Sequence, residues 1–230
     1  RGLGDVYKRQ LLPRPEANEA WPQAGGHPNH AMHHLAASGP LSWRWSADIG
    51  EGSNDEAQLI AEPIIDKGRI YTVDIEAQVT AFDAQSGRRL WRVELSRDDD
   101  EGILGGGIAA QEDRLFVTTG FADVVALDAK SGQEIWRKRL NGPMRAAPTV
   151  WAGRVFAVTV ANDLFALSAD DGRELWTHAG LREVAGLVGA APPAVEGSVV
   201  VVPYSSGEVV ALRVLSLIHI SEPTRRTPHS

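Results

Sequence analysis

One eleven-residue phrase occurs three times in this chain and constrains its fold more than any other feature. It reads AFDAQSGRRLW at residues 81–91, ALDAKSGQEIW at 126–136 and ALSADDGRELW at 166–176. Each copy ends in a tryptophan, and successive tryptophans are 45 and 40 residues apart. A period of this size indicates one supersecondary unit that is repeated in an array.

The sequence around each phrase predicts four short strands. In the second repeat, the β-branched and aromatic runs at residues 113–120 and 122–129 favour two strands, and another begins at Trp136. A further upstream strand fits AEPIIDKG, AAPTVWAG and AAPPAVEG, which precede equivalent apolar runs. Runs such as residues 198–204 are apolar on both faces, so both faces of each sheet must be covered. We therefore predict an all-β fold, a β-propeller of stacked four-stranded blades.

The repeated residues have predicted structural roles. The turn aspartates accept hydrogen bonds from backbone N–H groups that follow them, and the glycines take the positive φ of a tight reversal. The tryptophans bury large rings against the neighbouring sheet. These residues are Asp83, Asp128, Gly87, Gly132, Gly172, Trp91, Trp136 and Trp176.

The two ends of the chain do not resemble the rest. LSLIHISEPT, at residues 215–224, has a possible coding sequence whose reverse complement translates as RGLGDVYKRQ, which is residues 1–10. This relationship resembles a sequencing adapter that is read in both directions. We therefore assign residues 1–10 and 215–230 to adapter sequence and exclude them from fold prediction.

The remaining chain is divided into residues 11–40, an extended lead-in, and residues 41–214, a partial propeller. Full repeats at about 58–95, 103–140 and 146–178 are followed by a fourth from about residue 191. Trp45 is expected to belong to a blade that is completed from elsewhere in the protein. The chain is thus expected to hold about four blades, which form an incomplete ring.

Composition excludes several classes of function. The whole chain has a net charge of −7, and because the two excluded ends carry a net +3, the rest carries −10. Nucleic acid is therefore not an expected partner, since phosphate binding needs clusters of Lys and Arg. The chain has no cysteine, which excludes disulfides and thiolate chemistry within it.

The pattern A-x-D-x-x-x-G-x-x-x-W, complete at residues 81–91 and 126–136, is similar to the tryptophan-docking repeat of quinoprotein-like eight-bladed propellers. Ser168 replaces the aspartate in the third copy. Together with WSADIGEGSN and APPAVEGSVVVVPYSSGEVVAL, the stretch from Trp43 to Arg213 resembles the BamB-like outer-membrane assembly lipoproteins. The resemblance implies a scaffold without enzymatic activity or cofactor, on the periplasmic face of the bacterial outer membrane. It implies BamA periplasmic domains as the protein partner, and contact with the membrane only through a lipid anchor outside this chain.

The resemblance also implies that connections between blades carry the partner-binding residues. The corresponding stretches are 141–148 and 180–192, where apolar groups next to arginines suit a small interaction site. An inter-blade loop with buried leucines is the alternative for the second stretch. The candidate residues are Leu181, Arg182, Leu187, Val188, Met144 and Arg145.

Two other functions remain open from the sequence. One is a quinoprotein dehydrogenase that binds pyrroloquinoline quinone and calcium, and the other is a sensor or binding propeller fused to a kinase. A histidine group, His27, His30, His33 and His34, has the ligand type that zinc or copper prefers. Because no carboxylate or cysteine completes the group, we expect no metal site there.

Overall fold

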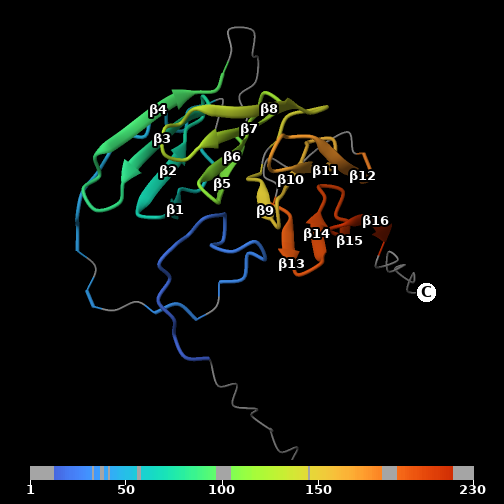
Figure 1. Ribbon diagram of the computed structural model, residues 1–230, viewed down its shortest axis with the longest axis horizontal. Coiled ribbons are helices and arrows are strands. Elements are labelled where there is room, and N and C mark those ends of the chain that lie inside the picture. Colours follow the sequence, from blue (N-terminus) through green and yellow to red (C-terminus); the bar gives the residue numbers. More distant parts are fainter. Residues whose placement is uncertain are drawn as a thin grey trace, which may run out of the picture.

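The chain forms four four-stranded antiparallel sheets that follow one another in sequence (Figure 1). The computed structural model describes residues 13–32, 34–36, 39–40, 42–55, 58–96, 105–144, 146–182 and 191–219. Within these ranges all regular structure is β-strand. The predicted all-β fold with four-stranded blades is therefore confirmed.

Each sheet is a meander in which neighbouring strands pair in chain order. The first blade comprises β1 (Ile64–Asp66), β2 (Arg69–Val73), β3 (Gln78–Asp83) and β4 (Arg89–Glu94). The second comprises β5 (Gly107–Gln111), β6 (Arg114–Thr118), β7 (Asp123–Asp128) and β8 (Glu134–Arg139). The third comprises β9 (Thr149–Trp151), β10 (Arg154–Val158), β11 (Asp163–Ser168) and β12 (Glu174–Ala179). The fourth comprises β13 (Ala194–Glu196), β14 (Val199–Pro203), β15 (Val209–Arg213) and β16 (Ser216–His219).

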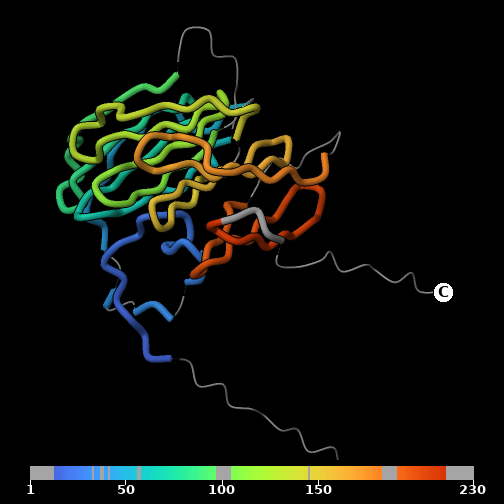
Figure 2. Tube along the Cα trace, turned by 45° about the vertical axis from the view of Figure 1, so that its right-hand side comes forward, coloured from blue at the N-terminus to red at the C-terminus, as the bar shows by residue number. Residues whose placement is uncertain are grey.

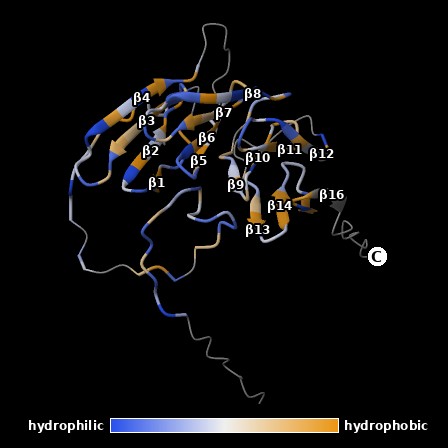
Figure 3. Cartoon of the chain, in the orientation of Figure 1, coloured by the Kyte–Doolittle hydropathy of each residue, from blue (hydrophilic) through white to orange (hydrophobic). Residues whose placement is uncertain are grey.

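The blades stack face to face, and their first strands contact one another in the order β1, β5, β9, β13 (Figure 2). Three buried apolar clusters fill the three interfaces between consecutive blades. Adjacent residues of β6 face opposite interfaces, because Leu115 and Val117 join the first cluster and Phe116 joins the second. This alternation explains why β6 carries a continuous run of apolar residues (Figure 3).

A register shift recurs between the third and fourth strands of every blade. It falls between Ala81 and Phe82 in the first blade and at the equivalent position in the second and third, and one residue later, between Leu212 and Arg213, in the fourth. A bulge of this kind increases the local twist and changes the direction of the side chains beyond it. Here it lies just before the turn that carries the repeat aspartate and glycine.

The fourth blade departs from the repeat at its end. Arg213 and Leu217 occupy the positions of Asp128 and Gly132 in the second blade. β16 falls within residues 215–230, which the sequence assigned to an adapter, and it pairs with β15 through Leu212↔His219 and Arg213↔Ser216. Antiparallel pairing uses main-chain groups that every residue other than proline supplies. The pairing therefore carries no sequence signal of its own.

Candidate protein-interaction surface

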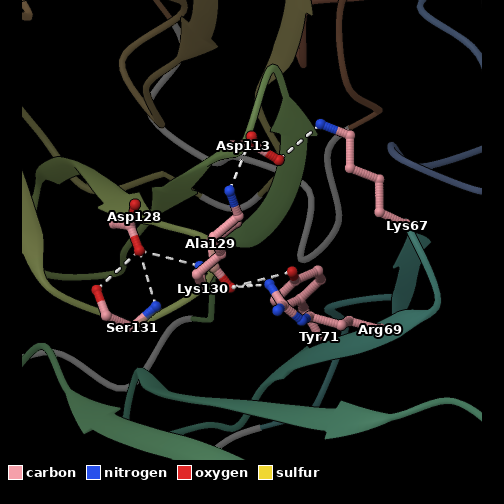
Figure 4. Close-up of polar contacts among 8 residues, drawn as sticks. All are labelled: Lys67, Arg69, Tyr71, Asp113, Asp128, Ala129, Lys130 and Ser131. Atoms are coloured by element: carbon pink, nitrogen blue, oxygen red, sulfur yellow. Dashed lines mark hydrogen bonds and ion pairs between the residues drawn. The ribbon is translucent and has the colours of Figure 1, made fainter.

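The repeat turns are built by their aspartates. In the second blade, Asp128 Oδ1 accepts hydrogen bonds from the Ser131 main-chain nitrogen at 2.8 Å and from the Ser131 hydroxyl at 2.7 Å (Figure 4). Asp83 makes the same pair of contacts with Ser86. These bonds, first from the serine hydroxyl and then from its N–H, lower the pKa of both carboxyl groups.

The third repeat contains the same pair of groups in reverse order. Ser168 stands at the aspartate position and Asp171 at the serine position. The Ser168 hydroxyl is the main cause of the lowered pKa of Asp171. Sequence reasoning treated Ser168 as a lost aspartate. The signal that it missed was the exchange of two residue types three positions apart.

Each repeat tryptophan bonds to the turn of the next blade. Its indole N–H donates to a main-chain carbonyl there: Trp91 to Ala129 at 3.2 Å, Trp136 to Ala169 at 3.0 Å and Trp176 to Val214 at 3.0 Å. Trp45 makes the same bond to Ala84 at 3.1 Å, although it lies outside the four sheets. The tryptophans therefore form a ladder that links successive turns.

The glycines receive the tryptophan rings. Gly87, Gly132 and Gly172 have φ values of 70°, 75° and 69°, which L side chains rarely adopt. A Cβ on Gly132 would lie 2.6 Å from the ring of Trp91, and a Cβ on Gly172 would lie 2.6 Å from the ring of Trp136. Each glycine is thus required twice, by its backbone conformation and by the ring that lies on it.

Further contacts strengthen the junction between the first two blades. Besides Trp91, the carbonyl of Ala129 receives the Tyr71 hydroxyl at 3.1 Å and the Arg69 guanidinium at 3.3 Å (Figure 4). Nearby, Asp113 pairs with Lys67 and Lys130 at 2.6 and 3.3 Å. These ion pairs are exposed and contribute little, so the buried contacts at Ala129 dominate.

The connection after the third blade presents an exposed leucine on a fixed main chain. Leu181 is 63% exposed. Its N–H donates to Glu208 Oε2 at 3.0 Å, and its carbonyl accepts from Asn162 Nδ2 at 2.7 Å. Arg182 follows and is also exposed. Leu187 and Val188 lie outside the described residues.

The connection after the second blade does not match its predicted role. Met144 is fully buried in the cluster between the second and third blades, where its main chain bridges to Thr159. The prediction that Met144 binds a partner is therefore wrong in this structure. A linker that crosses from one blade to the next passes over their interface, and an apolar side chain on it packs inward. Arg145 lies outside the described residues.

The described histidines do not converge on a common point. His30 contacts the Pro193 carbonyl and the Thr149 hydroxyl, whereas His34 contacts the Pro13 carbonyl. Among the described residues, no group of three or more His, Cys, Asp or Glu is placed to hold a metal ion. His33 lies outside that part of the chain.

Comparison with known proteins decides the family. Residues 30–102 and 76–216 match the family model described as outer membrane protein assembly factor BamB, which covers more than half of the chain. The chain belongs to the BamB family. The curated BamB of Alkalilimnicola ehrlichii is 44% identical over 54 residues, which are 24% of this chain and 14% of that protein.

Solved structures share the fold. The crystal structure of BamB from Moraxella catarrhalis matches 72% of this chain and 49% of its own, with a TM-score of 0.63 and 18% identity. A quinohemoprotein alcohol dehydrogenase from Pseudomonas putida matches 89% of this chain and 40% of its own, with a TM-score of 0.70 and 16% identity. The β-propeller prediction is confirmed. The chain spans half or less of the length of each of these BamB-family and dehydrogenase relatives.

The BamB family name refers to the outer membrane, so possible membrane-crossing segments are relevant. In the described part of the chain, no helix is long and apolar enough to cross a membrane.

Proposed function

We propose that this chain is part of a non-enzymatic scaffold in outer-membrane protein assembly, that it acts on the periplasmic face of the outer membrane, and that it binds the periplasmic domains of BamA. The observation that carries this proposal is the BamB family match over most of the chain. The propeller suits a scaffold, because its blades fix loops in space without a moving part.

The binding residue that the geometry favours is Leu181. An exposed leucine whose main chain is already hydrogen-bonded on both sides loses little conformational freedom on binding. Arg182, beside it, adds a long cationic side chain of the type enriched at interaction hot spots. Leu187 and Val188, in the same connection, and Arg145, in the preceding one, remain predicted contacts.

The proposal is tested by measuring how tightly the chain binds purified BamA periplasmic domains, by titration calorimetry. Leu181→Asp is expected to weaken binding on the order of tenfold or more, as for a central apolar contact. Ile135→Asp is the matched control, because Ile135 is 44% exposed on β8 of another blade and should leave the affinity unchanged. Equal effects of the two substitutions, or no binding by the unmodified chain, would contradict the proposal.

A quinoprotein dehydrogenase is the second candidate, favoured by the TM-score of 0.70 with the Pseudomonas putida alcohol dehydrogenase. The test adds pyrroloquinoline quinone and calcium to the purified chain and measures alcohol oxidation with an electron-accepting dye. We expect no turnover above the protein-free control. Turnover that depends on both additions would replace the scaffold proposal with the enzymatic one.

A further inference from the structure

A segment from Trp21 to His30, here called the axial segment, lies against the first strands of all four blades (Figures 1 and 2). The sequence predicted only an extended lead-in for this part of the chain. In the structure it contains the buried Gln23, and it makes main-chain or side-chain bonds to residues more than 40 positions away.

The axial segment contacts one equivalent position in each blade. These positions are Ile65, Ala110, Val150 and Val195, each of which pairs with the second residue of the next strand. The N–H of each donates to the axial segment: to Trp21 O at 2.8 Å, Pro22 O at 2.7 Å, Gln23 Oε1 at 2.8 Å and Pro28 O at 2.7 Å, respectively. The order of the contacts along the segment follows the order of the blades.

The first strands offer these donors because they are edge strands. Among the described strands, β1, β5, β9 and β13 each pair with one neighbouring strand, on one side. An unpaired strand edge presents free N–H and C=O groups, which a second chain can bond. The axial segment uses one such donor per blade.

Gln23 acts in place of a main-chain peptide group. Its Oε1 accepts from the Val150 N–H, and its Nε2 donates to the Val150 carbonyl at 2.9 Å. The side-chain amide thus completes both bonds that a paired strand residue would make. Trp21 makes the corresponding two bonds to Ile65 with its own main chain, at 2.6 and 2.8 Å.

Two turns shape the segment for this contact: the Gly26 N–H donates to the Gln23 carbonyl at 2.8 Å, and the His30 N–H donates to the His27 carbonyl at 2.9 Å. Gly25 and Gly26 have φ values of 67° and 81°, and a Cβ on Gly26 would lie 3.0 Å from the ring of Trp21. The reversal brings His30 to the fourth blade, where its ring contacts the Pro193 carbonyl at 2.9 Å. A fixed shape of this kind lowers the entropic cost of binding.

The axial segment does not fill all the space beside the fourth blade. A cavity of about 430 Å³ lies between it and the fourth blade, lined by residues that include Ala24, His30, Pro192 and Pro203. Apart from the buried Gln23 and Gly26, the residues of the axial segment are partly or fully exposed, so the segment can leave and return without unfolding the blades.

We propose that the edge formed by β1, β5, β9 and β13 is a binding site for an extended peptide, and that the axial segment is its occupant within this chain. The peptide that the site accepts has carbonyl groups at three spaced positions and one glutamine. A Gly-Gly turn allows it to reach the fourth blade. This site is separate from Leu181 and does not depend on the proposed binding of BamA.

The experiment separates the segment from the blades after the whole chain has folded. A recognition sequence for a specific protease is inserted next to Gly39, which is exposed and where an added Cβ would meet no atom within 4 Å. After cleavage, we expect the released N-terminal piece to elute with the blades in gel filtration. A labelled peptide of residues 13–36 is expected to exchange into the complex, whereas a scrambled peptide does not.

Substitutions are placed in the labelled peptide, so that the folding of the blades is unaffected. The Gln23→Leu peptide is expected to bind on the order of tenfold more weakly, because it lacks both bonds to Val150. The Gln23→Glu peptide keeps an acceptor but places a carboxylate oxygen against the Val150 carbonyl, so it should bind at least as weakly as the Gln23→Leu peptide. Met32→Ser is the matched control, because Met32 is 60% exposed, and this peptide should bind as the unmodified one does.

Amide hydrogen exchange on the intact chain provides an independent readout. Gln23→Leu should raise the exchange rate of the Val150 amide at least tenfold and leave the amides of β10 and β11 unchanged. The proposal is overturned if the cleaved piece separates from folded blades, if the scrambled peptide competes equally, or if Val150 exchanges at the same rate in both chains.

Discussion

The indole nitrogen of Trp136 lies 3.0 Å from the carbonyl oxygen of Ala169, across the interface between the second and third blades. The ring of the same tryptophan covers Gly172, so one side chain both bonds to and packs on a single turn of the next blade. Within its own blade the ring centroid lies 5.9 Å from that of Phe116. The tryptophan of one blade therefore packs on the turn of the next blade.

Truncation of Trp136 should separate the packing of the ring from its hydrogen bond. We expect Trp136→Ala to lower the free energy of unfolding by about 3 kcal/mol, because the substitution leaves a cavity over Gly172. Trp136→Phe should cost about 1 kcal/mol from the loss of the bond to Ala169, plus a smaller packing loss. Urea unfolding measures both. Trp43→Ala is the control, since Trp43 is 82% exposed; an equal loss there would contradict the docking role.

Alanine at two glycines should distinguish backbone strain from collision with the ring. Gly132 and Gly153 have φ values of 75° and 71°, so alanine is strained at both, by about 1 kcal/mol. Only at Gly132 does the added Cβ meet a tryptophan ring, whereas at Gly153 nothing lies within 4 Å. Gly132→Ala should therefore be the more destabilising by at least about 1 kcal/mol in thermal or urea unfolding. Similar losses of unfolding free energy at both positions would show that the Trp91 ring moves aside without cost and would contradict this prediction.

The Asp128 turn should make stability depend on pH. Because the folded state lowers the pKa of Asp128 below its ordinary 3.8, the ionised carboxylate stabilises the fold at pH values above 3.8. That contribution is lost as the pH falls through the lowered value. The difference in urea midpoint between the unmodified chain and Asp128→Asn should be largest near neutral pH and should shrink below pH 3.8. A difference that grows in acid would reverse the sign of the linkage and contradict this account.

The blades were predictable from the sequence because their contacts recur. Trp91, Trp136 and Trp176 each stand four residues after a glycine, and the turn, the bulge and the docking contact repeat with them. A periodic signal of this kind fixes the blade boundaries without knowledge of any single contact. Ser168 breaks the repeated sequence pattern at the aspartate position, but Asp171, three residues later, supplies the carboxylate of that turn.

The axial segment and Met144 could not be predicted in the same way. Gln23 bonds to Val150, which is 127 residues away, through groups that any glutamine and any backbone possess. Such a contact occurs once and leaves no period in the sequence. Met144 lies in a linker, for which exposure is the usual expectation. Its burial follows from the path of the linker across two blades, which only the three-dimensional arrangement reveals.

The buried ion pair between Arg137 and Asp123 should be the most sensitive polar contact of the second blade. Arg137 donates to Asp123 Oδ2 at 3.0 Å and to the Leu95 carbonyl at 3.0 Å, and Asp123 is 1% exposed. Among the described residues, Asp123 Oδ1 has no hydrogen-bond partner, so the carboxylate depends on the guanidinium for its charge compensation. We expect Arg137→Met to lower the free energy of unfolding by about 3 kcal/mol, because a buried charge is left unpaired. The double substitution Arg137→Met with Asp123→Asn should recover part of this loss, since no charge then remains buried. A double-mutant cycle in urea measures the coupling, and additive losses would show that the two side chains act independently.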